Sequence, residues 1–219
     1  MAKKKTILKE HLIDFYMDTV VVHEGNPFTV EELANTYNFR PEAFYEHFDS
    51  FGNLNKTIFR IFIDDAIVVL SQSTEYVGFS KKDKLLSLYF TLFENLTLNR
   101  EFVLLTIKSY GTNLNALSLF TELKESFTAF ISSLHMETLP LNDTLASIQK
   151  ISIQEGLWVQ FLCTLKFWMS DDSSQCEKTD IFIEKSINTG MELMNTKTLN
   201  NIIDLGKFLY TEKIKTNND

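Results

Sequence analysis

Side chains with catalytic or metal-binding potential are few in this 219-residue chain, and their spacing forms no recognisable site. Among the four histidines, only His11 has a carboxylate at helical spacing, that of Asp14, and one such pair does not make a metal site. The sequence contains no Gly-x-Ser-x-Gly nucleophile elbow, no phosphate-binding loop and no dinucleotide fingerprint. The acidic pairs at 64–65 and 171–172 are more typical of solvated faces or helix caps than of acid–base pairs. We therefore expect a protein that is not an enzyme and needs neither a metal nor a cofactor.

The two cysteines are too few for a disulfide framework, which indicates a reducing compartment. Cys163 lies in the apolar run 157–169, so we expect a buried, inert thiol, whereas Cys176 is expected to be an ordinary surface thiol near a helix start. The apolar run has 13 residues, fewer than the roughly 20 that a membrane helix needs. The N-terminal segment lacks the apolar core and cleavage site of a signal peptide. These features predict a soluble, cytoplasmic protein.

The composition indicates an all-α fold with large aromatic cores. There are only 7 glycines and 3 prolines, but 19 phenylalanines, and apolar residues recur mostly at helical spacing. Nucleic-acid binders often carry an overall excess of basic residues, and the net charge of −8 shows that this chain does not. We expect about ten helices, at approximately 6–22, 30–37, 41–48, 54–70, 80–98, 100–110, 115–135, 143–169, 177–194 and 199–213.

Local signals near the N-terminus predict a helix-turn-helix arrangement. The sequence Gly25-Asn26-Pro27 ends the first helix, and Thr29 with Glu32 forms a capping box at the start of the second. Asn38 tolerates the positive φ of a tight turn, and Pro41 suits the first position of a third helix. Two short helices joined by a tight turn and braced by a longer helix define this motif.

The same region resembles the TetR family of bacterial transcriptional regulators. The resemblance lies in the capped run 28–34, in Tyr45-Glu46-His47-Phe48 at the end of the recognition helix, and in the Ser-x-x-x-Leu entry at 50–54. It covers roughly residues 7–66 and implies an N-terminal DNA-binding domain, 1–55. A larger helical ligand-binding and dimerisation domain, 56–219, would follow. The sequence departs from the family's pattern at the turn (38–40) and at Glu42. It departs again at Phe51, where the family usually has a lysine that pairs with phosphate.

The resemblance implies a homodimer that contacts double-stranded DNA through residues of the turn, the recognition helix and the next helix. The candidates are Thr29, Arg40, Pro41, Ala43, Tyr45, His47 and Lys56. Arg40 is the best candidate for reading guanine. Residues 1–50 carry five basic and nine acidic side chains, a net charge of −4, so we expect weak or low-salt binding. The alternative is a non-enzymatic protein that binds a lipid or isoprenoid on the same fold, with vestigial DNA binding.

A second resemblance concerns residues 167–173 and 177–186. These are similar to a TetR-like group whose C-terminal domain is structurally related to the lipid-binding protein of coenzyme Q biosynthesis. It implies a dimer interface made by the helices at 151–169 and 177–194, although an intradomain core would give the same apolar pattern. An apolar or aromatic ligand would bind among the middle helices, and each of its candidate contacts could instead be a core residue. The candidates are Tyr89, Phe93, Phe102, Thr106, Tyr110, Phe127, Trp158 and Phe161.

Overall fold

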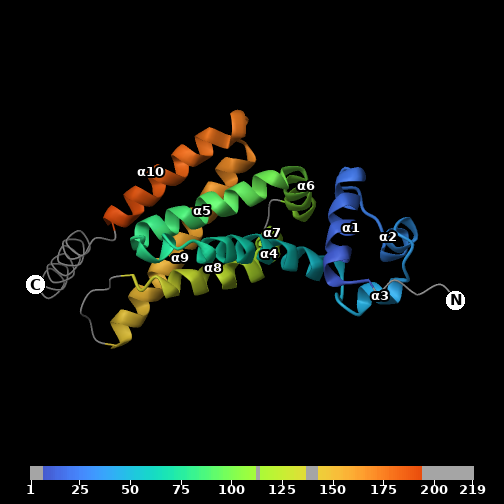
Figure 1. Ribbon diagram of the computed structural model, residues 1–219, viewed down its shortest axis with the longest axis horizontal. Coiled ribbons are helices and arrows are strands. Elements are labelled where there is room, and N and C mark those ends of the chain that lie inside the picture. The colour runs from blue at the N-terminus through green and yellow to red at the C-terminus, as the bar shows by residue number, and fades with distance from the viewer. Residues whose placement is uncertain (1–6, 112–113, 137–142, 194–219) are drawn as a thin grey trace, which may run out of the picture. The chain divides into compact units, whose positions relative to one another are not determined.

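The fold is all-α, as predicted. The computed structural model describes residues 7–111, 114–136 and 143–193, and within them the chain forms ten α-helices, two short 3-10 helices and no strand (Figure 1). The helices are α1 (Lys9–Val22), α2 (Val30–Thr36), α3 (Pro41–Tyr45), α4 (Phe51–Gln72), η1 (Tyr76–Gly78), α5 (Lys81–Leu98), α6 (Arg100–Tyr110), α7 (Leu114–Leu119), α8 (Thr121–Ser133), α9 (Asp143–Met169), η2 (Ser174–Cys176) and α10 (Glu177–Leu193). The helix expected at 199–213 lies outside the described residues, and the one expected at 115–135 is divided into α7 and α8.

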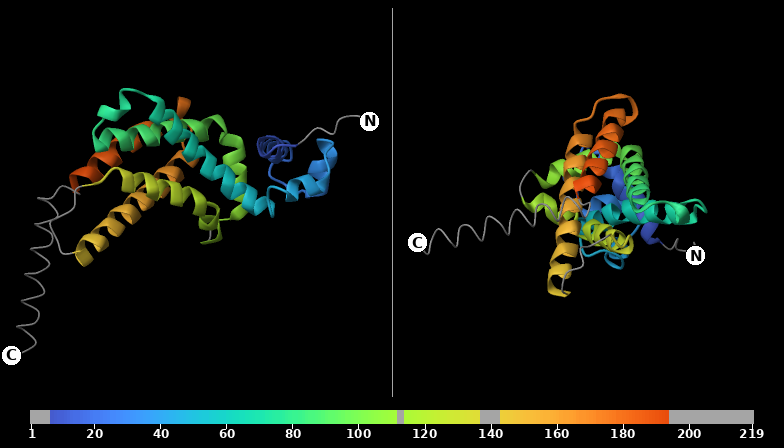
Figure 2. Two further views of the ribbon diagram at one scale, coloured as in Figure 1. Left: turned by 60° about the horizontal axis from the view of Figure 1, so that its bottom comes forward. Right: turned by 90° about the vertical axis from the view of Figure 1, so that its left-hand side faces the viewer.

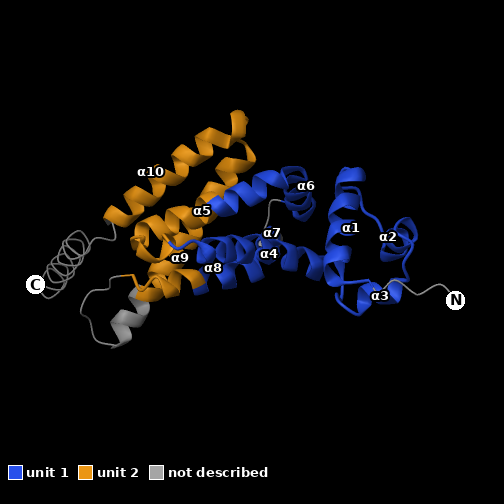
Figure 3. Cartoon of the chain, in the orientation of Figure 1, with its two compact units in different colours: residues 1–74, 91–129 blue, residues 75–90, 130–219 orange. Residues whose placement is uncertain are grey.

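The chain divides into two compact units (Figure 3). Unit 1 contains Met1–Thr74 and Thr91–Ala129, and unit 2 contains Glu75–Phe90 and Phe130–Asp219. Helix α4 belongs to unit 1 and runs unbroken away from α1–α3, as Figures 1 and 2 show. The expected domain boundary after residue 55 would cut this helix near its start, and as a functional boundary it stays a prediction.

The short helices α2 and α3 are built by the local signals that predict them. Thr29 Oγ1 accepts a hydrogen bond from the backbone N–H of Glu32 at 3.1 Å, and Glu32 Oε2 accepts one from the N–H of Thr29 at 2.7 Å, which confirms the capping box. Asn38 has φ of 55°, and Pro41 is the first residue of α3. Helix α3 ends at Tyr45, three residues earlier than expected.

Buried side chains fix these helices on their neighbours. Phe44 of α3 is completely buried, and Phe48 just after α3 is 2% exposed. Leu33 and Ala34 of α2 are buried as well. The rings of Phe15 and Phe39 stack with centroids 6.2 Å apart, so α1 contacts the turn between α2 and α3. The orientation of α3 is therefore set by aromatic packing beneath it.

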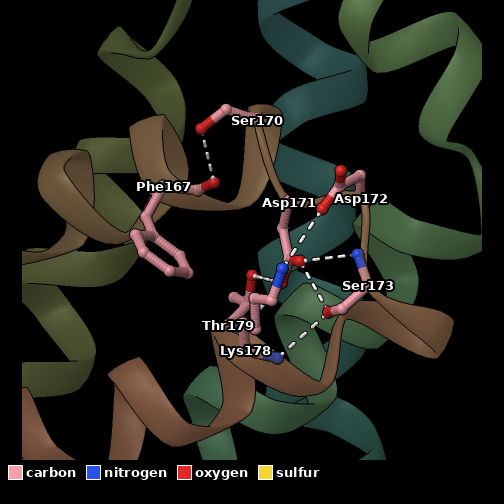
Figure 4. A network of polar contacts seen from close by, with 7 residues as sticks. All are labelled: Phe167, Ser170, Asp171, Asp172, Ser173, Lys178 and Thr179. Atoms are coloured by element: carbon pink, nitrogen blue, oxygen red, sulfur yellow. Dashed lines mark hydrogen bonds and ion pairs between the residues drawn. The ribbon is translucent and has the colours of Figure 1, made fainter.

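Unit 2 contains a polar network at the connection between α9 and α10 (Figure 4). Asp171 is 6% exposed and accepts four hydrogen bonds, from the N–H and hydroxyl groups of Ser173 and of Thr179. Burial alone would raise the pKa of Asp171, but these hydrogen bonds outweigh it and lower the pKa well below its usual range. The neighbouring Asp172 is exposed and pairs with Lys178 at 3.3 Å. The acidic pair 171–172 thus combines a helix cap with a solvated surface carboxylate, as expected.

The substitution Asp171→Asn is expected to lower the free energy of unfolding by about 1–3 kcal/mol, because an amide cannot accept all four hydrogen bonds. Since the folded-state pKa is lowered, the carboxylate stabilises the fold above the unfolded-state pKa of 3.8. That contribution is lost as the pH falls from there toward the folded-state pKa. Chemical denaturation between pH 7 and pH 3 measures both effects. Asp172→Asn is the matched control and should change stability by less than about 0.5 kcal/mol. Equal effects of the two substitutions at pH 7 would contradict this account.

Both cysteine predictions are wrong. Cys163 is exposed, because it lies four residues from the exposed Val159 and Phe167 and shares their face of α9. Cys176 is buried, at 8% exposed, where residues with φ of 52° (Gln175) and 61° (Cys176) reverse the chain before α10. The apolar run at 157–169 is long enough to cover both faces of α9, so hydropathy alone does not distinguish its inner face from its outer face.

Candidate nucleic-acid interface

Three of the side chains that the sequence assigns to DNA contact are exposed on or beside helix α3. Arg40, which precedes α3, and His47, which follows it, are exposed, and Tyr45 is 54% exposed. Pro41 and Ala43 are half-buried. The guanidinium group of Arg40 forms no hydrogen bond or ion pair with any residue that the structure describes, so it is available to a base edge or a phosphate.

The two other candidates are Thr29, which caps the start of α2, and Lys56 of α4. Thr29 is exposed, and its hydroxyl oxygen already accepts the α2 cap, which leaves the O–H as a donor for a phosphate oxygen. Lys56 is half-buried in the second turn of α4. All seven candidates belong to unit 1. Their role in DNA contact stays a prediction.

Acidic side chains surround this surface. Glu31, Glu32, Glu42 and Glu46 are all exposed. Glu42 lies in the first turn of α3, and Glu46 follows its last residue. A phosphate backbone that approaches α3 would therefore meet exposed carboxylates near Arg40, which weakens any electrostatic attraction.

A buried polar group that sequence reasoning missed lies where α4 begins. Asn55 is 4% exposed, and its Nδ2 donates to the hydroxyl of Tyr110 at 3.5 Å. Burial raises the pKa of Tyr16 to about 12, although the nearby Asn55 side chain lowers it. Asn55 is a polar residue in an otherwise apolar stripe of α4. This polar residue at a core position of the helical pattern is the one feature of the sequence that indicates a buried polar group here.

The candidates for a ligand pocket are placed in the cores of both units. Phe93, Phe102, Thr106, Tyr110 and Phe127 belong to unit 1, whereas Tyr89, Trp158 and Phe161 belong to unit 2. All are buried except Tyr110, which is half-buried. Thr106 lines a cavity of about 230 Å³ in unit 1. The other seven line none of the three cavities described for residues 7–111, 114–136 and 143–193, so the pocket stays a prediction.

Tyr89 is held by hydrogen bonds rather than presented to a cavity. Its hydroxyl donates to Gln160 Oε1 and lies 3.3 Å from the carbonyl oxygen of Leu157. Gln160 Nε2 in turn donates to Thr164 Oγ1 at 3.0 Å and to Ser186 Oγ at 2.8 Å. This network joins the part of α5 that belongs to unit 2 with α9 and α10. Burial raises the pKa of Tyr89 well above its usual value, so the phenol remains neutral.

An apolar surface extends over α9 and α10. Ile151 is 58% exposed, Val159 56% and Ile181 52%. The rings of Phe167 and Phe182 stack with centroids 4.8 Å apart beside a hollow of about 640 Å³. We define the α9–α10 apolar face as the exposed large apolar side chains of these two helices. They are Ile151, Val159, Phe167 and Ile181.

These features define an all-α protein with an N-terminal helix-turn-helix and a larger helical region. Residues 84–209, more than half of the chain, match the family described as tetracyclin repressor-like, C-terminal domain, and the chain belongs to the TetR family of regulators. The family predicted from the sequence is thereby confirmed. No curated protein matches the chain. Within the described residues, no helix combines the length and apolar character needed to cross a membrane.

Proposed function

We propose that this TetR-family regulator acts in the cytoplasm as a homodimer that binds a double-stranded DNA operator. The observation that carries the proposal is the contrast in exposure at α3. The side chains of Arg40, Tyr45 and His47 are exposed on or beside this helix, whereas Phe44 is fully buried and anchors it. A recognition helix held from beneath in this way can enter a major groove and present its outer side chains to base edges.

The α9–α10 apolar face is proposed as the dimer interface. Large apolar side chains exposed together on two neighbouring helices are typical of protein–protein contacts. A symmetric contact through α9 and α10 would pair the two copies and bring two recognition helices to one operator. Successive major grooves require a spacing of about 34–36 Å between these helices.

Regulation would follow from a change in that spacing. An apolar or aromatic ligand in the C-terminal region would displace α4, which starts directly after the helix-turn-helix and runs unbroken from Phe51 to Gln72. A displaced α4 would change the separation of the two recognition helices. The proposal includes no catalytic step.

A second candidate function is a lipid or isoprenoid carrier with vestigial DNA binding. The observation that favours it is the acidic surface beside Arg40, including Glu42 and Glu46. Analysis of molecules extracted from the purified protein, together with DNA titration, separates the two functions. A bound isoprenoid with no DNA binding would favour the carrier.

We expect the logarithm of the DNA affinity to fall with the logarithm of salt concentration with a slope of about −2 to −4. Few phosphates are neutralised here, and each contributes about −0.9 to the slope. Glu42→Gln should strengthen binding to all sequences, because it removes a carboxylate from the first turn of α3. Fluorescence anisotropy titrations between about 50 and 200 mM salt measure both quantities.

The matched control is Glu94→Gln, which removes an exposed carboxylate from α5. It should leave the DNA affinity unchanged. If the wild type does not bind DNA and Glu42→Gln does not restore binding, the DNA-binding proposal fails and the carrier is favoured.

A further inference from the structure

A partly enclosed cavity of about 230 Å³ lies in unit 1, where α1, the segment before α2, the start of α4 and α6 come together. Its wall is mainly apolar. The principal lining residues are Tyr16, Val20, Phe28, Phe51, Leu105 and Thr106. A cavity of roughly 150 Å³ with such a lining holds benzene, so this one has room for one or two aromatic rings.

Three rings form one side of the cavity. The ring centroids of Tyr16 and Phe51 are 4.8 Å apart, those of Phe28 and Phe51 are 5.0 Å apart, and those of Tyr16 and Phe28 are 5.7 Å apart. Among the residues that the structure describes, no lysine, arginine, histidine or acidic side chain lines the cavity. Tyr16 stays neutral, because burial raises its pKa to about 12. The lining therefore favours an uncharged guest with an aromatic face.

One lining side chain has an unused hydrogen-bonding group. Thr106 is 3% exposed, and its hydroxyl has no hydrogen-bond partner within the described residues. Buried hydroxyl groups normally have a partner. A threonine in a helix takes either of two χ1 rotamers, so rotation can bring this hydroxyl to a guest.

We propose that this cavity binds a small neutral aromatic molecule with one hydrogen-bonding group, of the size of an indole, and that Thr106 is the polar contact. The rings provide the stacking surface, and the threonine hydroxyl selects a guest that carries an N–H or O–H group. This site is distinct from the ligand pocket predicted among the middle helices, with which it shares only Thr106.

The position of the cavity gives it a route to regulation, and this consequence rests on the proposed DNA binding. Leu105 of α6 lies 3.4 Å from the place where a Cβ would stand on Gly25, so α6 is in direct contact with the end of α1. Phe28 precedes the α2 cap, and Phe51 begins α4. A guest between these groups acts on the helices that orient α3.

The direct test is titration of the full chain with indole, followed by NMR or calorimetry. We expect saturable binding of one indole per chain with a dissociation constant on the order of 1 mM. Thr106→Val removes the hydroxyl at constant shape and should weaken binding about 2- to 13-fold. Leu105→Trp should abolish binding by filling the cavity.

Thr97→Val is the matched control, because Thr97 Oγ1 donates to the carbonyl oxygen of Phe93 at 2.7 Å and Thr97 does not line the cavity. It should lower thermal stability and leave indole binding unchanged, whereas Thr106→Val should not lower thermal stability. The inference is overturned if indole does not bind at about 5 mM, well above the expected dissociation constant. It is also overturned if Thr106→Val binds indole like the wild type. Neither readout involves DNA, so these failures are distinguishable from failure of the proposed function.

Discussion

Replacing Arg40 by alanine is expected to weaken specific DNA binding about 5- to 150-fold per half-site, which corresponds to about 1–3 kcal/mol. Arg40 is exposed and immediately precedes α3, and its guanidinium group has no partner among the described residues. A bidentate guanidinium–guanine contact is lost in this variant, so base preference at one position of each half-site should relax as well. Titration of single-base variants of a selected operator measures both the affinity and the preference.

The matched control for this experiment is Arg60→Ala. Arg60 is also exposed, but it lies on α4 and its Nε donates to Asp64 at 3.1 Å. Its removal should change the affinity by less than about twofold, because an exposed pair of this kind contributes little and the residue is not beside α3. If Arg40→Ala and Arg60→Ala weaken binding equally, Arg40 does not read a base.

A charge placed on the α9–α10 apolar face is expected to separate the proposed homodimer. Val159 is 56% exposed in the single chain, so Val159→Glu should leave the helical content and thermal stability of the monomer unchanged. In a dimer the same carboxylate would be buried without a partner, at a cost of about 3–5 kcal/mol. The dimer dissociation constant should therefore rise at least 100-fold. Sedimentation at micromolar concentration measures this change.

Val68→Glu provides the matched control, since Val68 is 51% exposed on α4. It makes the same chemical change away from α9 and α10, and it should leave the dimer intact. A wild-type chain that sediments as a 25.4 kDa monomer would contradict the proposed dimer, as would a Val159→Glu variant that remains dimeric.

The features that the sequence predicted well are those determined by a few neighbouring residues. The Thr29–Glu32 capping box, the positive φ of Asn38 and the start of α3 at Pro41 all follow from local hydrogen bonding and backbone sterics. These local features, together with the spacing of aromatic residues, were sufficient to indicate the family.

The predictions that failed concern features that depend on contacts between distant segments. Cys163 is exposed and Cys176 is buried because of the way α9 and its connection to α10 are packed, and an apolar run does not reveal which face is inside. The same limit applies to the pocket candidates. Buried residues at helical spacing can fill a core, as Tyr89 does, or line a cavity, as Thr106 does.

The most direct test of the central claim is selection of bound duplexes from a random DNA pool by the full chain at about 50 mM salt. A homodimer with two recognition helices should enrich two related half-sites, with centres separated by about 10–10.5 base pairs or a multiple of that spacing. Enrichment of such paired half-sites, lost in Arg40→Ala, is the predicted result. A pool that shows no enrichment, or only unpaired sequences, would contradict the account.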